Sequence, residues 1–122
     1  MARVVIDDTD LVVRLSLRET LGARRREVRV PLAALREVYV EPDWWRALRG
    51  RCGRGMWVPG RLCVGVRLLP DGRDFAVVRE GAPVVCVELR RSAPYGRLAV
   101  SDPDPEGVLG ALLPHVPADR LG

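Results

Sequence analysis

The sequence predicts a mainly β domain: an antiparallel barrel or split sandwich of about seven to eight strands that ends in one α-helix. Apolar and polar residues alternate in short runs, turn residues separate these runs, and the spacing becomes helical near the C-terminus. One domain is expected over 1–122, because this length is near the commonest size for a single hydrophobic core.

The first strands form a predicted hairpin. Val4 and Ile6 share one face of a strand, the turn 7–10 follows, and apolar residues then alternate with polar ones from Leu11 to Leu17. The same alternation places Val5 and Val12 on the outer face of this hairpin.

Two further strands complete the first predicted sheet. Val28 and Val30 alternate with charged residues up to Pro31, and Val38 and Val40 do so after a short turn. Residues 1–41 are therefore expected to form one sheet, and 42–60 a connection rich in Trp, Arg and Gly.

The second predicted sheet covers residues 61–101. Its first two strands form a hairpin about the turn 70–72, and its last two follow the turn at 81–83 and Pro94. Their apolar positions are Leu62, Val64, Val66 and Leu68, then Phe75 and Val77, then Val85, Val87 and Leu89, and finally Leu98 and Val100.

A helix is predicted over 103–113, followed by a tail at 114–122. Asp and Pro residues from 102 to 105 suit a helix start, and Pro114 and Pro117 discourage continuation. One stripe of this helix should cover an apolar opening of the sheets. The stripe consists of Val108, Leu109, Leu112 and Leu113.

The charge is modest and unevenly distributed. All 20 basic residues are Arg, and the net charge is +4. Residues 41–61 hold most of the excess positive charge, with five Arg and two acidic residues. The overall charge is small for a protein that must neutralise many phosphates, so nucleic acid is disfavoured as a partner.

The inventory of catalytic and metal-ligating residues is poor. Cys52, Cys63 and Cys86 form no metal-binding pair, and His115 is the single histidine. Cys63 and Cys86 are expected on one sheet face, with no base beside either thiol.

Turn and cap roles are the interpretation of four carboxylates, those of Asp71, Asp74, Asp102 and Asp104. The Gly-rich segment 50–55 lacks the pattern of a phosphate-binding loop. We therefore expect no enzyme, no metal and no cofactor.

A cytoplasmic location is expected, because the N-terminus lacks the pattern of a secretory signal.

The candidate binding surface lies in the segment 42–61. Trp offers a flat apolar face and Arg offers planar donors for carboxylate or phosphate. Adjacent residues on a short helix point about 100° apart, so Trp44 and Trp45 should not both be buried; one of them is expected to pack beneath the helix. The candidate residues are Trp44, Trp45, Arg46, Arg49, Arg51, Arg54 and Trp57.

Several motifs resemble small pleckstrin-homology-like (PH-like) proteins of high-GC Gram-positive bacteria. They are the segment 30–35 leading into a strand, the segment 42–50, Pro59 with Gly60, and the segment 72–75. The resemblance implies a PH-like barrel whose C-terminal helix plugs one end, and a non-enzymatic role. The sequence departs from lipid-binding relatives, because Asp7, Asp8 and Asp10 occupy the first hairpin loop, where phosphate binding would need basic residues. Arg24, Arg25 and Arg26 are the alternative basic loop.

Two binding functions follow as hypotheses. The first is a module for protein–protein interaction or self-association, and the alternative is peripheral binding to anionic lipid headgroups at the inner face of the membrane through residues 42–61. Exposed aromatic and Arg side chains suit both functions.

Overall fold

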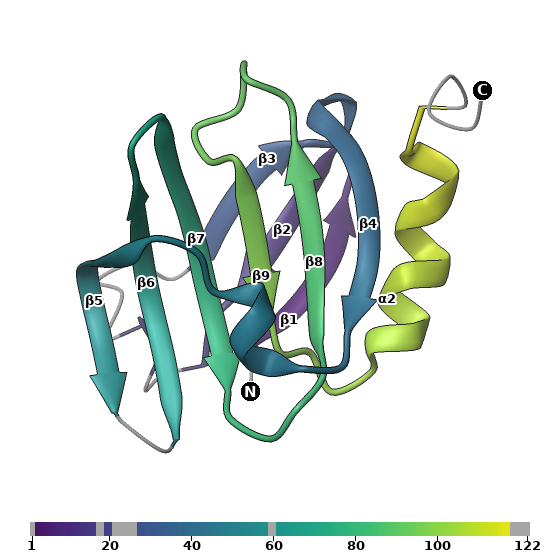
Figure 1. The fold of residues 1–122 in the computed structure, drawn as a ribbon. Coiled ribbons are helices and arrows are strands. Elements are labelled where there is room, and N and C mark those ends of the chain that lie inside the picture. The colour runs from purple at the N-terminus through teal and green to yellow at the C-terminus, as the bar shows by residue number, and fades with distance from the viewer. Residues whose placement is uncertain (1, 17–18, 21–26, 59–60, 118–122) are drawn as a thin grey trace.

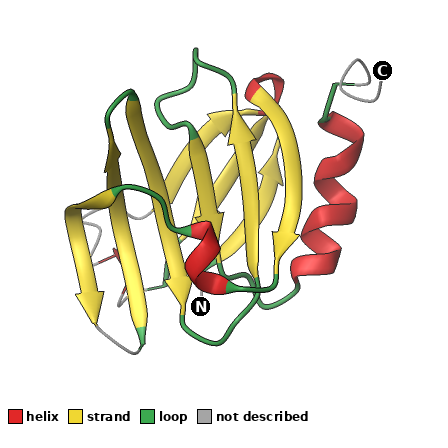
Figure 2. Cartoon of the chain, viewed as in Figure 1, coloured by secondary structure: helices red, strands yellow, loops and turns green. Residues whose placement is uncertain are grey.

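The computed structural model describes residues 2–16, 19–20, 27–58 and 61–117. It is mainly β, with two sheets packed face to face and one C-terminal α-helix (Figures 1 and 2). No strand in these ranges is shared between the two sheets, so the expected closed barrel is not formed. Among the described helices, none is long and apolar enough to cross a membrane.

The smaller sheet has three antiparallel strands: β1 (Arg3–Asp7), β2 (Asp10–Arg14) and β3 (Glu27–Pro31). The predicted first hairpin is confirmed, since Val4 pairs with Val13 and Asp7 with Asp10. The second strand ends at Arg14, before the predicted end at Leu17, which lies outside the described residues. Val12 lies on the face away from the core residues Leu11 and Val13, as predicted, but it is fully buried there.

The larger sheet has six strands in the order β4-β8-β9-β7-β6-β5 (Figure 1). The hairpin of β6 and β7 is confirmed, with continuous pairing from Leu62 with Arg79 to Leu69 with Gly72. The strand bounds are β4 (Leu35–Glu41), β5 (Arg51–Val58), β6 (Leu62–Leu69), β7 (Gly72–Arg79), β8 (Val84–Leu89) and β9 (Arg97–Val100).

Two predicted groupings are corrected by this sheet. Residues 1–41 do not form one sheet, because the short helix η1 (Leu32–Ala34) redirects the chain and β4 pairs with β8. The segment 42–60 is more than a connection, because it contains the helix η2 (Trp44–Ala47) and the strand β5. The glycines of β5 interrupt the alternation from which a strand could be predicted.

Strand β9 is inserted between β7 and β8, and its pairing with β7 is parallel. Leu98 and Val100 face the smaller sheet, while Ala99 faces the opposite side, and all three are fully buried. Three consecutive apolar residues that are buried on both faces suit the centre of a sheet that is covered on both sides, and the first residue of β9, Arg97, is paired with Glu88.

The main core fills the space between the sheets. Phe75 of β7, Leu98 of β9 and Val64 of β6 pack there with Leu11 and Val13 of β2. Burial of these apolar side chains is the main favourable contribution to folding.

Helix α2 (Pro105–Leu112) lies alongside β4, at the opposite edge of the larger sheet from β5 (Figure 1). Asp104 caps its N-terminus by accepting a hydrogen bond from the backbone N–H of Gly107 at 3.1 Å. Val108 and Leu112 are buried in the core, and Leu109 packs against it. The fourth predicted stripe residue, Leu113, is 49% exposed, because the chain leaves α2 there for the short helix η3 (Leu113–His115).

Candidate functional site

Helix η2 covers part of the outer face of the larger sheet. Ala47 is buried there in a second, smaller core, against Ala76, Ala99 and Cys86 of the sheet. These sheet residues are small and leave room for the helix backbone. Trp44 is half-buried against this second core, as predicted for one of the two tryptophans.

Trp45 is the exposed member of the tryptophan pair. Its exposed fraction is 56%, and its ring meets the Trp44 ring edge-on at a centroid distance of 5.8 Å. The packing of Trp44 thus holds Trp45 at the surface with one flat side available.

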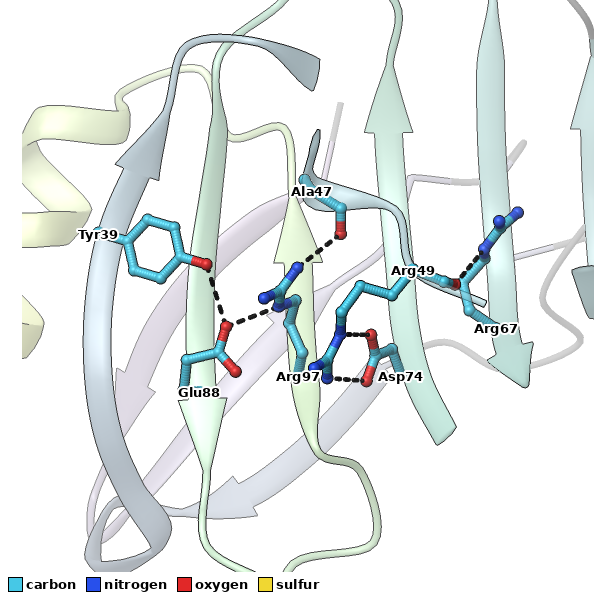
Figure 3. Close-up of polar contacts among 7 residues, drawn as sticks. All are labelled: Tyr39, Ala47, Arg49, Arg67, Asp74, Glu88 and Arg97. Carbon is cyan, nitrogen blue, oxygen red and sulfur yellow. Dashed lines mark hydrogen bonds and ion pairs between the residues drawn. The ribbon is translucent and has the colours of Figure 1, made fainter. Parts of the chain in front are cut away.

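A row of charged side chains crosses the same outer face next to η2. In the strand register Glu88 lies beside Arg97, Arg97 beside Asp74, and Asp74 beside Arg67. Opposite charges on adjacent strands stabilise the pairing. Glu88 accepts a hydrogen bond from Arg97 Nε at 2.6 Å and one from the Tyr39 hydroxyl at 3.1 Å (Figure 3).

This row also fastens the chain that leaves η2. Arg97 donates to the carbonyl oxygen of Ala47, and Arg67 donates to that of Arg49 (Figure 3). Arg67 also donates to the carbonyl oxygen of Gly50. Arg49 binds both carboxylate oxygens of Asp74, at 2.8 and 2.7 Å. We call Arg49, Arg67, Asp74, Glu88 and Arg97 the clamp, since together they hold residues 47–50 against the sheet.

Asp74 corrects a sequence interpretation. It is not a turn residue: it lies on β7 with its side chain 2% exposed, as the partner of Arg49. The available signal was alternation, because Asp74, Ala76 and Val78 occupy every second position of a strand and so share one face.

The electrostatics of this face disfavour nucleophilic chemistry. Burial raises the pKa of the Cys86 thiol to about 11, so the thiol stays protonated at neutral pH. Burial also raises the pKa of Tyr39, and the Asp74 carboxylate raises that of Arg49. Cys63 and Cys86 are both buried on this face and outside any disulfide, but β9 and β7 separate their strands.

Strand β5 forms an edge of the larger sheet and carries the third tryptophan. Trp57 is 59% exposed and lies opposite Cys63 of β6. Two glycines allow β5 to approach β6 closely: a Cβ on Gly55 would overlap the carbonyl oxygen of Val64, and one on Gly65 that of Arg54. The glycines of this segment therefore serve strand packing, in agreement with the missing phosphate-loop pattern.

Of the seven candidate residues, two are engaged in contacts within the protein, one is mostly exposed but has an ion pair, and four are exposed. Trp44 packs against the second core, and Arg49 is engaged in the clamp. Arg46 is mostly exposed, with a 3.5 Å ion pair to Asp43. The remaining candidates, Trp45, Arg51, Arg54 and Trp57, are exposed.

The candidate segment lines a small cavity of about 30 Å³, to which Arg54 and Trp57 of β5 contribute. A groove of about 850 Å³ lies at the end of the larger sheet, bounded by the loop between β8 and β9 and the turn between β6 and β7. Of the seven candidates, Arg49 alone lines it. Its other basic residues are Arg36, Arg73, Arg90 and Arg91, whose separation in sequence concealed their proximity.

The acidic first hairpin loop is partly neutralised. Arg29 of β3 pairs with Asp7 at 3.0 Å and with Asp10 at 3.1 Å, and both raise the pKa of its guanidinium. Arg29 also contacts Glu27. The three carboxylates therefore offset the positive charge of Arg29 at this loop.

Comparisons with known proteins add no relative: no family model, curated protein or solved structure matches the chain. Within the described ranges, no three His, Cys, Asp or Glu side chains are grouped as a metal site requires. Pro59 and Gly60, which contribute to the PH-like resemblance, and the alternative basic loop Arg24 to Arg26 lie outside the described residues.

Proposed function

We propose that the chain is a non-catalytic binding module that takes an acidic, extended protein segment along β5. The observation that carries this proposal is the exposed edge of β5, which presents Trp57 within a stretch of chain that has no acidic residue.

The edge supplies the backbone part of the interaction. Among the described strands β5 pairs with β6 alone, whereas the opposite edge strand, β4, lies against α2. An extended peptide can add to an open edge through main-chain hydrogen bonds, and its alternate side chains then meet the two faces of the sheet. Trp57 supplies a large apolar contact of the kind that dominates binding energies.

The charge of this region supports an acidic partner. Residues 44–70 contain six Arg and no Asp or Glu. Arg51 and Arg54 are exposed on β5 itself. An acidic segment would be attracted to this strand, whereas a second copy of β5 would bring like charges together. An acidic partner is thus favoured over self-association.

The absence of catalysis is part of the proposal and has physical support. The carboxylates of Asp74 and Glu88 are committed to Arg49 and Arg97. The Cys86 thiol is fully buried and its pKa is raised. The reduced thiols of Cys63 and Cys86 agree with the reducing cytoplasm that we infer as the setting.

A remote relationship to PH-like proteins is also inferred. It is supported by the order of the elements, in which hairpin-rich sheets precede one C-terminal helix that packs on the core. The parallel pairing of β7 with β9 and the open sheets depart from that family's barrel.

Isothermal titration calorimetry with a short peptide of alternating Glu and Val tests the proposed function. The matched control peptide alternates Lys and Val. We expect the acidic peptide to bind and the basic one not to bind. Trp57→Ala should weaken binding about thirtyfold or more, because an interface hot spot contributes about 2 kcal/mol or more. Charge reversal by Arg54→Glu should also weaken it, whereas Arg14→Glu on the smaller sheet should have little effect.

Two outcomes would overturn this function. One is equal binding of both peptides, or binding that ignores Trp57→Ala. The other is co-sedimentation with phosphatidylglycerol vesicles, lost on Trp57→Ala, without any peptide binding; this result would establish the membrane alternative.

A further inference from the structure

The groove at the end of the larger sheet suggests a second binding activity, independent of β5. We propose that this groove binds a small anion with two or more phosphate or carboxylate groups. Its volume of about 850 Å³ falls in the range of small-molecule sites, roughly 300–1,000 Å³.

The groove has an excess of positive charge that is not visible in the sequence. Two of its carboxylates, Asp74 and Glu88, are already neutralised by Arg49 and Arg97 at 2.7 and 2.6 Å (Figure 3). Asp71 is its remaining acidic residue. Against it stand four further arginines, Arg36, Arg73, Arg90 and Arg91.

Three of these arginines are available to a ligand. Arg36, Arg90 and Arg91 are exposed and form no salt bridge within the part of the chain that the structure describes. They come from β4 and from the loop between β8 and β9, so they can approach an anion from different sides. A guanidinium binds phosphate or carboxylate through two parallel hydrogen bonds, which favours a ligand with several such groups.

Hydrogen bonds hold the backbone of the loop between β8 and β9 and the side chain of Arg73 in place. The Arg90 N–H donates to the carbonyl oxygen of Ala34 beside β4, and the Gly96 N–H donates to that of Arg73. Arg73 Nε donates to the Pro94 carbonyl at 3.2 Å, and its guanidinium lies 5.0 Å from the ring centre of Tyr95. A site fixed in this way loses less conformational entropy when it binds a ligand.

Calorimetric titrations with pyrophosphate and with citrate, at constant ionic strength, test the anion site. We expect saturable binding of at least one of these anions. The double variant Arg90→Gln with Arg91→Gln should weaken it tenfold or more, because each charged hydrogen bond contributes about 1.5 kcal/mol or more and about 1.4 kcal/mol corresponds to tenfold. The matched control, Arg3→Gln with Arg14→Gln, removes two exposed charges from the smaller sheet and should leave binding unchanged.

A second arm distinguishes the source of the phosphate. Co-sedimentation with phosphatidylglycerol vesicles that the groove variant abolishes and the control variant retains would assign the site to lipid headgroups. Binding of the free anions alone would assign it to soluble ligands.

The proposal is overturned if neither the anions nor the vesicles bind, or if the control variant weakens binding as much as the groove variant. Trp57→Ala should leave anion binding intact, so failure of the β5 function and failure of this site are distinguishable.

Discussion

The ion pair between Arg49 and Asp74 gives the most direct test of the clamp. Arg49→Ala removes both hydrogen bonds to a carboxylate that is 2% exposed and leaves that carboxylate in the sheet face without its partner. The same substitution frees one side of the chain that joins η2 to β5. We therefore expect a large decrease in the free energy of unfolding, although the Arg49 side chain is partly exposed.

The magnitude follows from the burial of the two partners. Removing one member of a fully buried pair costs roughly 3–5 kcal/mol. Because the Arg49 side chain is 37% exposed, solvent screens part of the interaction, and we expect a cost of about 2–3 kcal/mol. The control is Arg46→Ala in the same segment: its 3.5 Å pair with Asp43 is exposed, so this change should cost less than about 1 kcal/mol.

Urea denaturation followed by tryptophan fluorescence measures both costs. A double-mutant cycle with Asp74→Ala isolates the coupling, which should reach about 1–3 kcal/mol in favour of the intact pair. If Arg49→Ala and Arg46→Ala cost the same, or if the cycle gives no coupling, the assignment of Arg49 to the clamp is refuted.

Three further predictions concern single positions. Gly110→Ala should stabilise the protein by up to about 1 kcal/mol, because an added Cβ meets open space in a helix. Gly107→Ala should instead destabilise the protein, because the added Cβ displaces the Asp104 cap. Thermal denaturation of both variants compares the two effects. Below about pH 9, near the ordinary pKa of a thiol, the Cys86 thiol should contribute little pH dependence to the free energy of unfolding. As the pH rises from there toward 11, the free energy of unfolding should fall, because the folded state retains a proton that the unfolded state has lost. Cys86→Ala should flatten this decline, which approaches at most about 1.4 kcal/mol per pH unit; an equally steep decline in the variant would contradict the assignment. Gly55→Ala should lower the free energy of unfolding in urea by about 2–3 kcal/mol, because the φ of 149° and the contact with β6 both exclude a side chain. An unchanged free energy of unfolding would mean that β5 does not approach β6 as described.

Local periodicity predicted the elements whose two faces differ. The first hairpin and the β6–β7 hairpin each build one core face from alternate apolar residues on both sides of a turn, so their alternation identified strands and turns together. The C-terminal helix could be predicted from its cap residues and its apolar stripe, although Leu113 proved to lie outside the helix.

The arrangement of the strands could not be predicted in the same way. The position of β9 between β7 and β8 depends on long-range packing of Leu98, Ala99 and Val100, which are buried on both faces and which alternation does not specify. Strand β5 was missed because Gly53 and Gly55 break its pattern, and their use became clear only from the close approach to β6.

The candidate surface was predicted in part. The reasoning that adjacent helical tryptophans point in different directions predicted that the two rings would not both be buried; Trp44 is half-buried and Trp45 is exposed. The engagement of Arg49 with Asp74 was missed because the two residues are 25 positions apart, a separation at which sequence alone gives no geometry.

Amide hydrogen exchange along β5 tests the central claim, that its edge is open in the free protein and is covered by an acidic segment. In the free protein the outward-facing amides of residues 51–58 should exchange rapidly and those bonded to β6 slowly. Addition of the Glu-Val peptide should slow the rapid set and leave the amides of β1 unchanged. Uniform protection of β5 before the peptide is added, or no change after it binds, would contradict the claim.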